Sequence, residues 1–97
     1  MTFSIAVKCR ETGMYGVAAT TTSLGVGCRC LYAKANTGAV LTQHSTDPRR
    51  GTRGIEMLSH GKTAKEVIDE LVTGDPTIGH RQLAVVDGEG NTAYFLG

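Results

Sequence analysis

The N-terminal part of the chain alternates between large apolar side chains and small ones. From Thr2 to Lys8, every second position is large and apolar (Phe3, Ile5 and Val7), and Ser4 and Ala6 stand between them. This period of two predicts a half-buried strand. The segment YGVAATTTS follows a turn at CRETGM, which contains Gly13, and is rich in β-branched and small residues. Together the two runs predict an antiparallel hairpin.

The middle of the chain changes from strand-like to helical patterns. LGVGCRC is rich in glycine and predicts a bend or loop, whereas TGAVLTQ predicts another strand. In STDPRRGTRGIEMLSHG, Asp47 is expected as a helix N-cap and Pro48 as the first helical residue. Ile55 and Leu58 lie three residues apart on one face of this helix, and Gly61 is expected to end it.

The segment KTAKEVIDELVTGDP gives the clearest helical signal. Thr63 and Glu66 have the spacing of a capping box. An apolar stripe follows, formed by Val67, Ile68, Leu71 and Val72. Gly74 and Pro76 are expected to end this helix.

The C-terminal segment HRQLAVVDGEGNTAYFLG predicts a second hairpin around DGEGN, where Gly88 and Gly90 can adopt positive φ. The expected order is two strands, an optional third, a further strand, two helices and two strands, in one domain segment spanning 1–97. GVAAT and LAVVD lack polar alternation, which is typical of strands covered on both faces. Two helices cover only one face of a sheet. We therefore expect that the 97 residues do not fold stably alone.

Composition narrows the classes of function. The chain has ten Lys and Arg residues and nine Asp and Glu residues. The resulting net charge of +1 gives no electrostatic reason for binding nucleic acid or an anionic membrane. There is no apolar run of membrane-spanning length and no signal-peptide pattern, so a cytoplasmic location with free thiols is expected. Cys28 and Cys30, with the isolated His60 and His80, do not have zinc-site spacing. We expect no metal and no cofactor.

Five ordered stretches resemble the first half of the domain-of-unknown-function family number ten-twenty-eight: MTFSIAVK, TGMYGVAATTTSLGVG, ANTGAVLTQ, GTRGIEML and HRQLAVVDGEGNTAYFLG. The resemblance covers nearly all 97 residues. It implies membership of the N-terminal-nucleophile (Ntn) hydrolases, the proteasome-like superfamily. The implied fold is α+β, an αββα sandwich of two stacked sheets covered by helices, of which this chain supplies roughly half. A second polypeptide, either a C-terminal half or a separate subunit, is expected to complete the sandwich in an oligomer.

The superfamily implies hydrolysis of an amide or related C–N bond of a small molecule. Thr2 resembles the nucleophile position and would be exposed if Met1 is removed, since its hydroxyl can attack a carbonyl while its own α-amine accepts the proton. The simpler interpretation is that Thr2 only begins a strand. The resemblance also implies a lysine near the nucleophile, which would be Lys34; a solvated lysine is the alternative.

Substrate-binding candidates come from strand ends and from the first predicted helix. Hydroxyls such as that of Thr21 can bind polar substrate groups or pair across strands. Gln43 and His44 follow the strand GAVLTQ, where polar surface is the alternative interpretation. Three arginines could hold a substrate carboxylate or could simply be solvated: Arg49, Arg50 and Arg53.

Three hypotheses concern the whole assembly. Gly97 follows the strand TAYFL directly, and glycine commonly precedes the self-cleavage point of Ntn precursors. We therefore expect one subunit of a self-processed or two-gene hydrolase, in which the partner's first residue could be the nucleophile instead of Thr2. The alternatives are a non-catalytic binding or scaffold subunit with an Ntn-like fold, and a fragment without activity.

Overall fold

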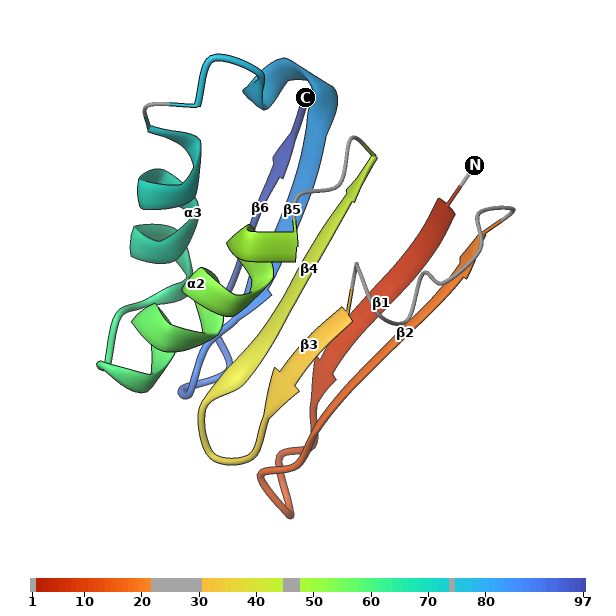
Figure 1. The fold of residues 1–97 in the computed structure, drawn as a ribbon. Coiled ribbons are helices and arrows are strands. Elements are labelled where there is room, and N and C mark those ends of the chain that lie inside the picture. The colour runs from red at the N-terminus through yellow and green to blue at the C-terminus, as the bar shows by residue number, and fades with distance from the viewer. Residues whose placement is uncertain (1, 22–30, 45–47, 74) are drawn as a thin grey trace.

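The computed structural model describes residues 2–21, 31–44, 48–73 and 75–97. Two antiparallel sheets stack on each other, and the described α-helices lie on the far side of the larger sheet (Figure 1). The smaller sheet pairs β1 (Thr2–Lys8) with β2 (Tyr15–Thr21). The larger sheet has the order β3-β4-β5-β6, built from β3 (Leu31–Lys34), β4 (Gly38–His44), β5 (Arg81–Val86) and β6 (Thr92–Leu96). The helices are α2 (Pro48–Ser59), α3 (Ala64–Val72) and the 3₁₀-helix η1 (Ile78–His80). The predicted α+β class is confirmed.

The N-terminal hairpin forms as predicted, and the face of β1 that carries the small side chains is the one turned inward. β1 and β2 pair from Thr2–Thr21 to Lys8–Tyr15, and Gly13 takes a φ of 73° in the turn. The large side chains of β1 are exposed, at 66% for Phe3, 58% for Ile5 and 47% for Val7. The intervening small residues, such as Ser4, face the larger sheet. Small side chains let the two sheets approach closely, so the strand turns its smaller face inward.

The third strand occupies LYAK, and the whole of the Gly-rich LGVGCRC lies outside the described residues. β3 pairs with β4, where Lys34 is opposite Gly38. A Cβ added to Gly38 would lie 2.5 Å from the carbonyl oxygen of Val86 and 2.8 Å from Leu58. Gly38 also has a φ of 152°, so only glycine suits this crossing of β4, β5 and α2.

The two predicted helices are confirmed, and they build the core against the larger sheet. α2 begins at Pro48 as expected, while the proposed N-cap Asp47 lies outside the described residues. The capping box of α3 is present: Thr63 accepts from the Glu66 amide at 3.2 Å, and Glu66 accepts from the Thr63 amide at 2.9 Å. Gly74, the expected stop of α3, is not among the described residues. The helices bury an apolar cluster with β4 and β5: Val40, Met57, Leu58, Ala64, Val67, Ile68, Leu71, Leu83 and Val85.

The C-terminal hairpin also forms as predicted. In its turn Gly90 takes a positive φ of 84°, whereas Gly88 does not. The prediction of two covered faces holds for LAVVD, because Leu83 and Val85 face the helices and Val86 is buried on the other side. It fails for GVAAT in the described residues, where Gly16, Ala18 and Thr20 are exposed. The outer face of the smaller sheet therefore lacks a covering layer within the part of the chain that the structure describes (Figure 1).

Candidate functional site

A chain of polar side chains joins the two sheets near one end of the stack. The Ser4 hydroxyl donates to the side-chain oxygen of Gln43 at 2.9 Å, and the Gln43 amide donates to the side-chain oxygen of Gln82 at 3.4 Å. Gln43 and Gln82 are also opposite each other in the β4–β5 ladder. These three half-buried side chains hold the beginning of β1 over the end of β4. We call them the inter-sheet polar cluster.

Four sequence-predicted residues gather at the end of the stack that contains this cluster. Thr2 lies two residues before Ser4 on β1 and is paired with Thr21, the last residue of β2. His44 follows Gln43 as the last residue of β4 and is opposite Arg81. The structure thus brings the backbones of Thr2, Thr21, Gln43 and His44 to one end, where the N-terminus also lies in Figure 1.

Lys34 lies at the opposite end of the stack. It closes β3 opposite Gly38, and Gly38 is beside Val86 and Asp87. The same end holds Lys8, whose Nζ donates to the carbonyl oxygen of Gly88 at 2.8 Å. A strand rises about 3.3 Å per residue, so the six steps from Thr2 to Lys8 span about 20 Å. The structure therefore does not bring Lys34 near Thr2, contrary to the expectation from the resemblance.

The three arginines lie on α2, in the helical layer, and do not gather around one point between the sheets. Arg50 donates to the carbonyl oxygen of Leu71 at 2.8 Å and pairs with Asp75 at 2.8 Å. Arg49 is exposed, and Arg53 lines a cavity of about 220 Å³ together with Glu56, Met57, His60 and Lys62. Arg50 is therefore already engaged by the C-terminal end of α3 and by Asp75, whereas a carboxylate-binding role of Arg49 and Arg53 stays a prediction.

Asp75 forms a small ionic cluster that the sequence analysis did not identify. Its side chain is 4% exposed and pairs with Arg50 and with Arg81, each at 2.8 Å. The pKa of Asp75 is lowered to about 2, and the hydrogen bond from the Thr77 backbone amide is the largest cause. The Thr77 hydroxyl and the two arginines lower this pKa further, and together these groups outweigh burial, which raises it. This cluster fastens α2 and the segment before β5, so its role is structural.

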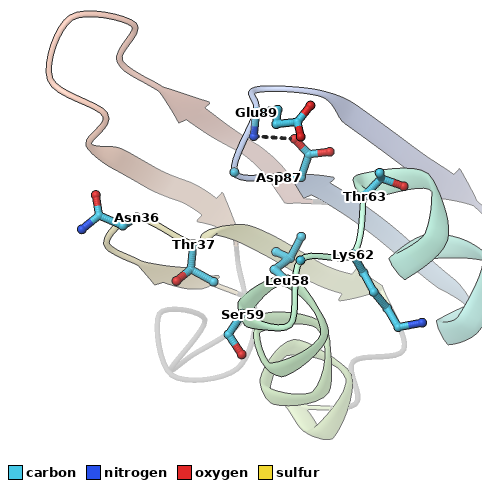
Figure 2. Close-up of a pocket in the computed structure, with 10 residues that line it drawn as sticks. Asn36, Thr37, Leu58, Ser59, Lys62, Thr63, Asp87 and Glu89 are labelled. Atoms are coloured by element: carbon cyan, nitrogen blue, oxygen red, sulfur yellow. Dashed lines mark hydrogen bonds between the residues drawn. The ribbon is translucent and has the colours of Figure 1, made fainter.

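Asp87 lines a cavity of about 290 Å³ between the β3–β4 turn, the end of α2, the start of α3 and the β5–β6 turn (Figure 2). Asp87 is 3% exposed, and its carboxylate accepts three backbone hydrogen bonds of 2.9 Å, from Ala64, Glu89 and Asn91. Burial raises the pKa of Asp87, but these hydrogen bonds outweigh it and lower the value overall. Because its oxygens are occupied and its proton affinity is lowered, Asp87 is unsuited to act as a general base.

The smaller sheet also reaches this turn. The Tyr15 hydroxyl donates to the carbonyl oxygen of Asp87 at 2.9 Å. Burial, followed by the charge of Asp87, raises the pKa of Tyr15. The signal for Asp87 in the sequence was its place at the start of DGEGN, since Asp commonly accepts backbone hydrogen bonds within a turn. Its additional bond to the start of α3 depends on tertiary packing and has no sequence signal.

The described ranges hold neither a metal-binding cluster nor a membrane-spanning helix. No three His, Cys, Asp or Glu side chains gather there in a way that could hold a metal ion, and Cys28 and Cys30 lie outside those ranges. Cys9 is an exposed free thiol. None of the described helices is long and apolar enough to cross a membrane.

Comparison with known proteins identifies the family. A model described as "Family of unknown function (DUF1028)" matches residues 2–97. The chain belongs to this family. The predicted resemblance to family ten-twenty-eight is thereby confirmed, and no curated protein matches this DUF1028 chain.

A solved structure supports the fold of the DUF1028 chain. It is the crystal structure of protein SPO2555 from Silicibacter pomeroyi, which is also described as DUF1028. The two share 34% sequence identity with a TM-score of 0.93 over 99% of this chain. The match covers 45% of the SPO2555 chain, so the DUF1028 chain spans less than half of that protein's length.

Proposed function

We propose that this chain forms part of an Ntn-type amidohydrolase that cleaves an amide or related C–N bond of a small molecule. In this proposal Thr2 is the nucleophile once Met1 has been removed. The observation that carries the proposal is the 2.9 Å hydrogen bond between Ser4 and Gln43, because it holds the first residues of β1 over a strand end rich in polar groups. A nucleophile at the start of a strand, beside the polar end of a stacked sheet, has access to both solvent and substrate.

The proposed reaction uses only the first residue as nucleophile and base. The Thr2 hydroxyl oxygen attacks the substrate carbonyl carbon while its proton passes to the free α-amine of Thr2. Such an amine has a reference pKa of about 7.7–8.0, so a useful fraction is neutral near pH 7. The amine then gives the proton to the departing nitrogen, the C–N bond breaks and an ester with Thr2 forms. Water hydrolyses this ester and restores the hydroxyl.

Substrate contacts in the proposal come from the same end of the sheets. After its bonds with Ser4 and Gln82, the carboxamide of Gln43 keeps a second N–H and a second oxygen lone pair, which suit hydrogen bonding to an amide. His44 follows Gln43 on β4, and Thr21 is paired with Thr2 on β2; both are proposed to bind substrate polar groups. Lys34 and Arg50 have no part in this proposed site, since one lies at the other end and the other is bound to Asp75 and Leu71.

Intact mass and N-terminal sequencing of the active protein test the identity of the nucleophile. We expect a chain beginning at Thr2, with turnover in a screen of small amides that falls about 10³-fold or more in Thr2→Ala. Thr52→Ala is the matched control, because Thr52 is exposed on α2. A retained Met1 in fully active material would eliminate Thr2. If a companion polypeptide then began with Thr, Ser or Cys, that residue would be the nucleophile. Absence of turnover with every amide, despite a free Thr2, would favour the scaffold alternative.

A further inference from the structure

Gln82 belongs to the inter-sheet polar cluster but has no part in the proposed reaction so far. It lies opposite Gln43 in the β4–β5 ladder. Its side chain points to the side of the larger sheet on which β1 lies, because it bonds to Gln43 and Gln43 bonds to Ser4. Ser4 is two residues from Thr2 on β1, which is about 7 Å along a strand. A group bound at this cluster is therefore within the length of one small molecule from the proposed nucleophile.

The hydrogen bonds of the cluster run in one direction. The Ser4 hydroxyl donates to Oε1 of Gln43, and Nε2 of Gln43 donates to Oε1 of Gln82. Gln82 is thus the last acceptor, and neither N–H of its own Nε2 has a partner among the described residues. This half-buried Nε2 is reached by solvent. Together with the second N–H of Gln43, it offers N–H donors to a bound molecule.

The charged neighbour of Gln82 faces the other way. Arg81 precedes Gln82 on β5, so its side chain points to the helical layer, where Nε pairs with Asp75 at 2.8 Å. Asp75 also pairs with Arg50 of α2 at 2.8 Å. Among the described residues at this end of the inner face, a carboxylate would therefore meet uncharged N–H groups, and taking it out of water without a cation is costly. A neutral carbonyl oxygen loses less on leaving water and accepts from the same donors.

We propose that Gln82 binds a second, uncharged carbonyl oxygen of the substrate, and that the substrate is a small neutral diamide. Nε2 of Gln82 and the second N–H of Gln43 donate to this oxygen, while the bond from Gln43 to Oε1 of Gln82 fixes the direction of both carboxamides. The amide that is cleaved lies on the side of Thr2. This inference rests on the proposed function for one point, that the molecule bound at the cluster is the substrate.

Binding of three small acetamides to the complete protein, meaning this chain with the polypeptide that completes it, tests the proposal. N-acetylglycinamide carries a neutral carboxamide, N-acetylglycine a carboxylate and N-acetylethylenediamine an ammonium group. The Thr2→Ala protein is used so that no probe is consumed. We expect N-acetylglycinamide to shift the NMR signals of the Gln82 side-chain N–H groups and to bind at least about tenfold more tightly than N-acetylglycine. Equal or tighter binding of N-acetylglycine, or no shift of these signals with any probe, would overturn the proposal.

Gln82→Glu sharpens the result, because it keeps an oxygen for the Gln43 N–H and removes both N–H donors of residue 82. We expect it to weaken binding of N-acetylglycinamide at least about tenfold and to strengthen binding of N-acetylethylenediamine, a gain that misfolding cannot produce. Thr52→Glu is the matched control, since it adds the same charge at an exposed position of α2 and should change neither affinity. Equal changes in the two variants would contradict a contact between Gln82 and the probe.

Failure of the proposed hydrolysis is distinguishable from failure of this inference. If the unsubstituted protein cleaves no amide while the Thr2→Ala protein binds N-acetylglycinamide at Gln82, the hydrolase proposal is wrong and the amide-binding role of Gln82 is supported. If turnover depends on Thr2 but anionic amides are the better substrates, the hydrolase proposal is supported and this inference is overturned.

Discussion

Ser4 and Gln43 are 39 positions apart in the sequence, yet the hydroxyl of one donates to the carboxamide oxygen of the other at 2.9 Å. This hydrogen bond crosses between two sheets that share no ladder. It therefore fixes how the smaller sheet is placed along the larger one. Because the proposed nucleophile lies two residues before Ser4, the same contact determines which strand end the start of β1 faces.

Removing this bond should weaken the stack by a measurable amount. Ser4→Ala leaves the Gln43 oxygen without its donor, and we expect a loss of about 1 kcal/mol in the free energy of unfolding of the complete protein. Urea denaturation measures it. Ser59→Ala is the control, because the Ser59 hydroxyl donates only to the carbonyl oxygen of Glu56 at the exposed end of α2. Equal stability of the two variants would contradict a role for Ser4 in joining the sheets.

Asp75 should make stability depend on acid pH. Its folded pKa of about 2 lies below the ordinary value of 3.8, so the unfolded chain binds the proton first as pH falls. The stabilisation is therefore complete above about pH 4 and is lost as pH drops towards 2. Asp75→Asn should lower stability at pH 7 and flatten its fall across this window, as followed by urea denaturation at each pH.

The control for this titration is Asp69→Asn. Asp69 pairs with Lys65 at 3.0 Å, but both side chains are largely exposed, at 63% and 83%. Solvent screens such pairs strongly, so the substitution should change stability little at any pH. A flattening of the pH dependence as large as that in Asp75→Asn would show that general surface charge, not the Arg50–Asp75–Arg81 cluster, causes it.

Gly38→Ala should be strongly destabilising. The new methyl would meet the Val86 carbonyl oxygen, which belongs to the β5 backbone and cannot rotate away, and the φ of 152° adds strain. We expect a cost of about 2–4 kcal/mol, measured by thermal or urea unfolding. Gly79→Ala provides the control, since a Cβ there meets nothing within 4 Å. A loss in Gly38→Ala no greater than in this control would mean that β4 can move away from β5.

The chain expressed alone should not unfold in one cooperative monomeric transition. Phe3, Ile5 and Val7 on the outer face of the smaller sheet, and Tyr94 and Leu96 on β6, leave two apolar surfaces in contact with water. We expect association, or a broad non-cooperative change, in urea titrations combined with analytical ultracentrifugation. A sharp transition of a monomer would show that the segment is stable by itself.

Sequence patterns predicted most of the elements because the signals are local. The capping box of Thr63 and Glu66, the proline at the start of α2 and the two hairpin turns depend on neighbours within a few residues. The alternation in β1 predicted two distinct faces, but not which face is covered, since that depends on what packs against the strand. The strand pattern placed Thr2, Thr21, Gln43 and His44 at the ends of strands, where the structure has them. It could not show that Lys34 lies at the other end of the stack, because that depends on how the two sheets pack.

The turn that begins at Asp87 joins two strands of the larger sheet and forms hydrogen bonds with both other layers of the fold, the helices and the smaller sheet. The Asp87 carboxylate binds the first turn of α3, while Tyr15 and Lys8 from the smaller sheet donate to the carbonyl oxygens of Asp87 and Gly88. The start of α3 and the smaller sheet are far apart in the sequence, and this turn is hydrogen-bonded to both of them. Disorder in this one turn would release the helix start and the smaller sheet at once. Folding of the helical layer and docking of the hairpin should therefore be one cooperative event, with the β5–β6 turn as its common step.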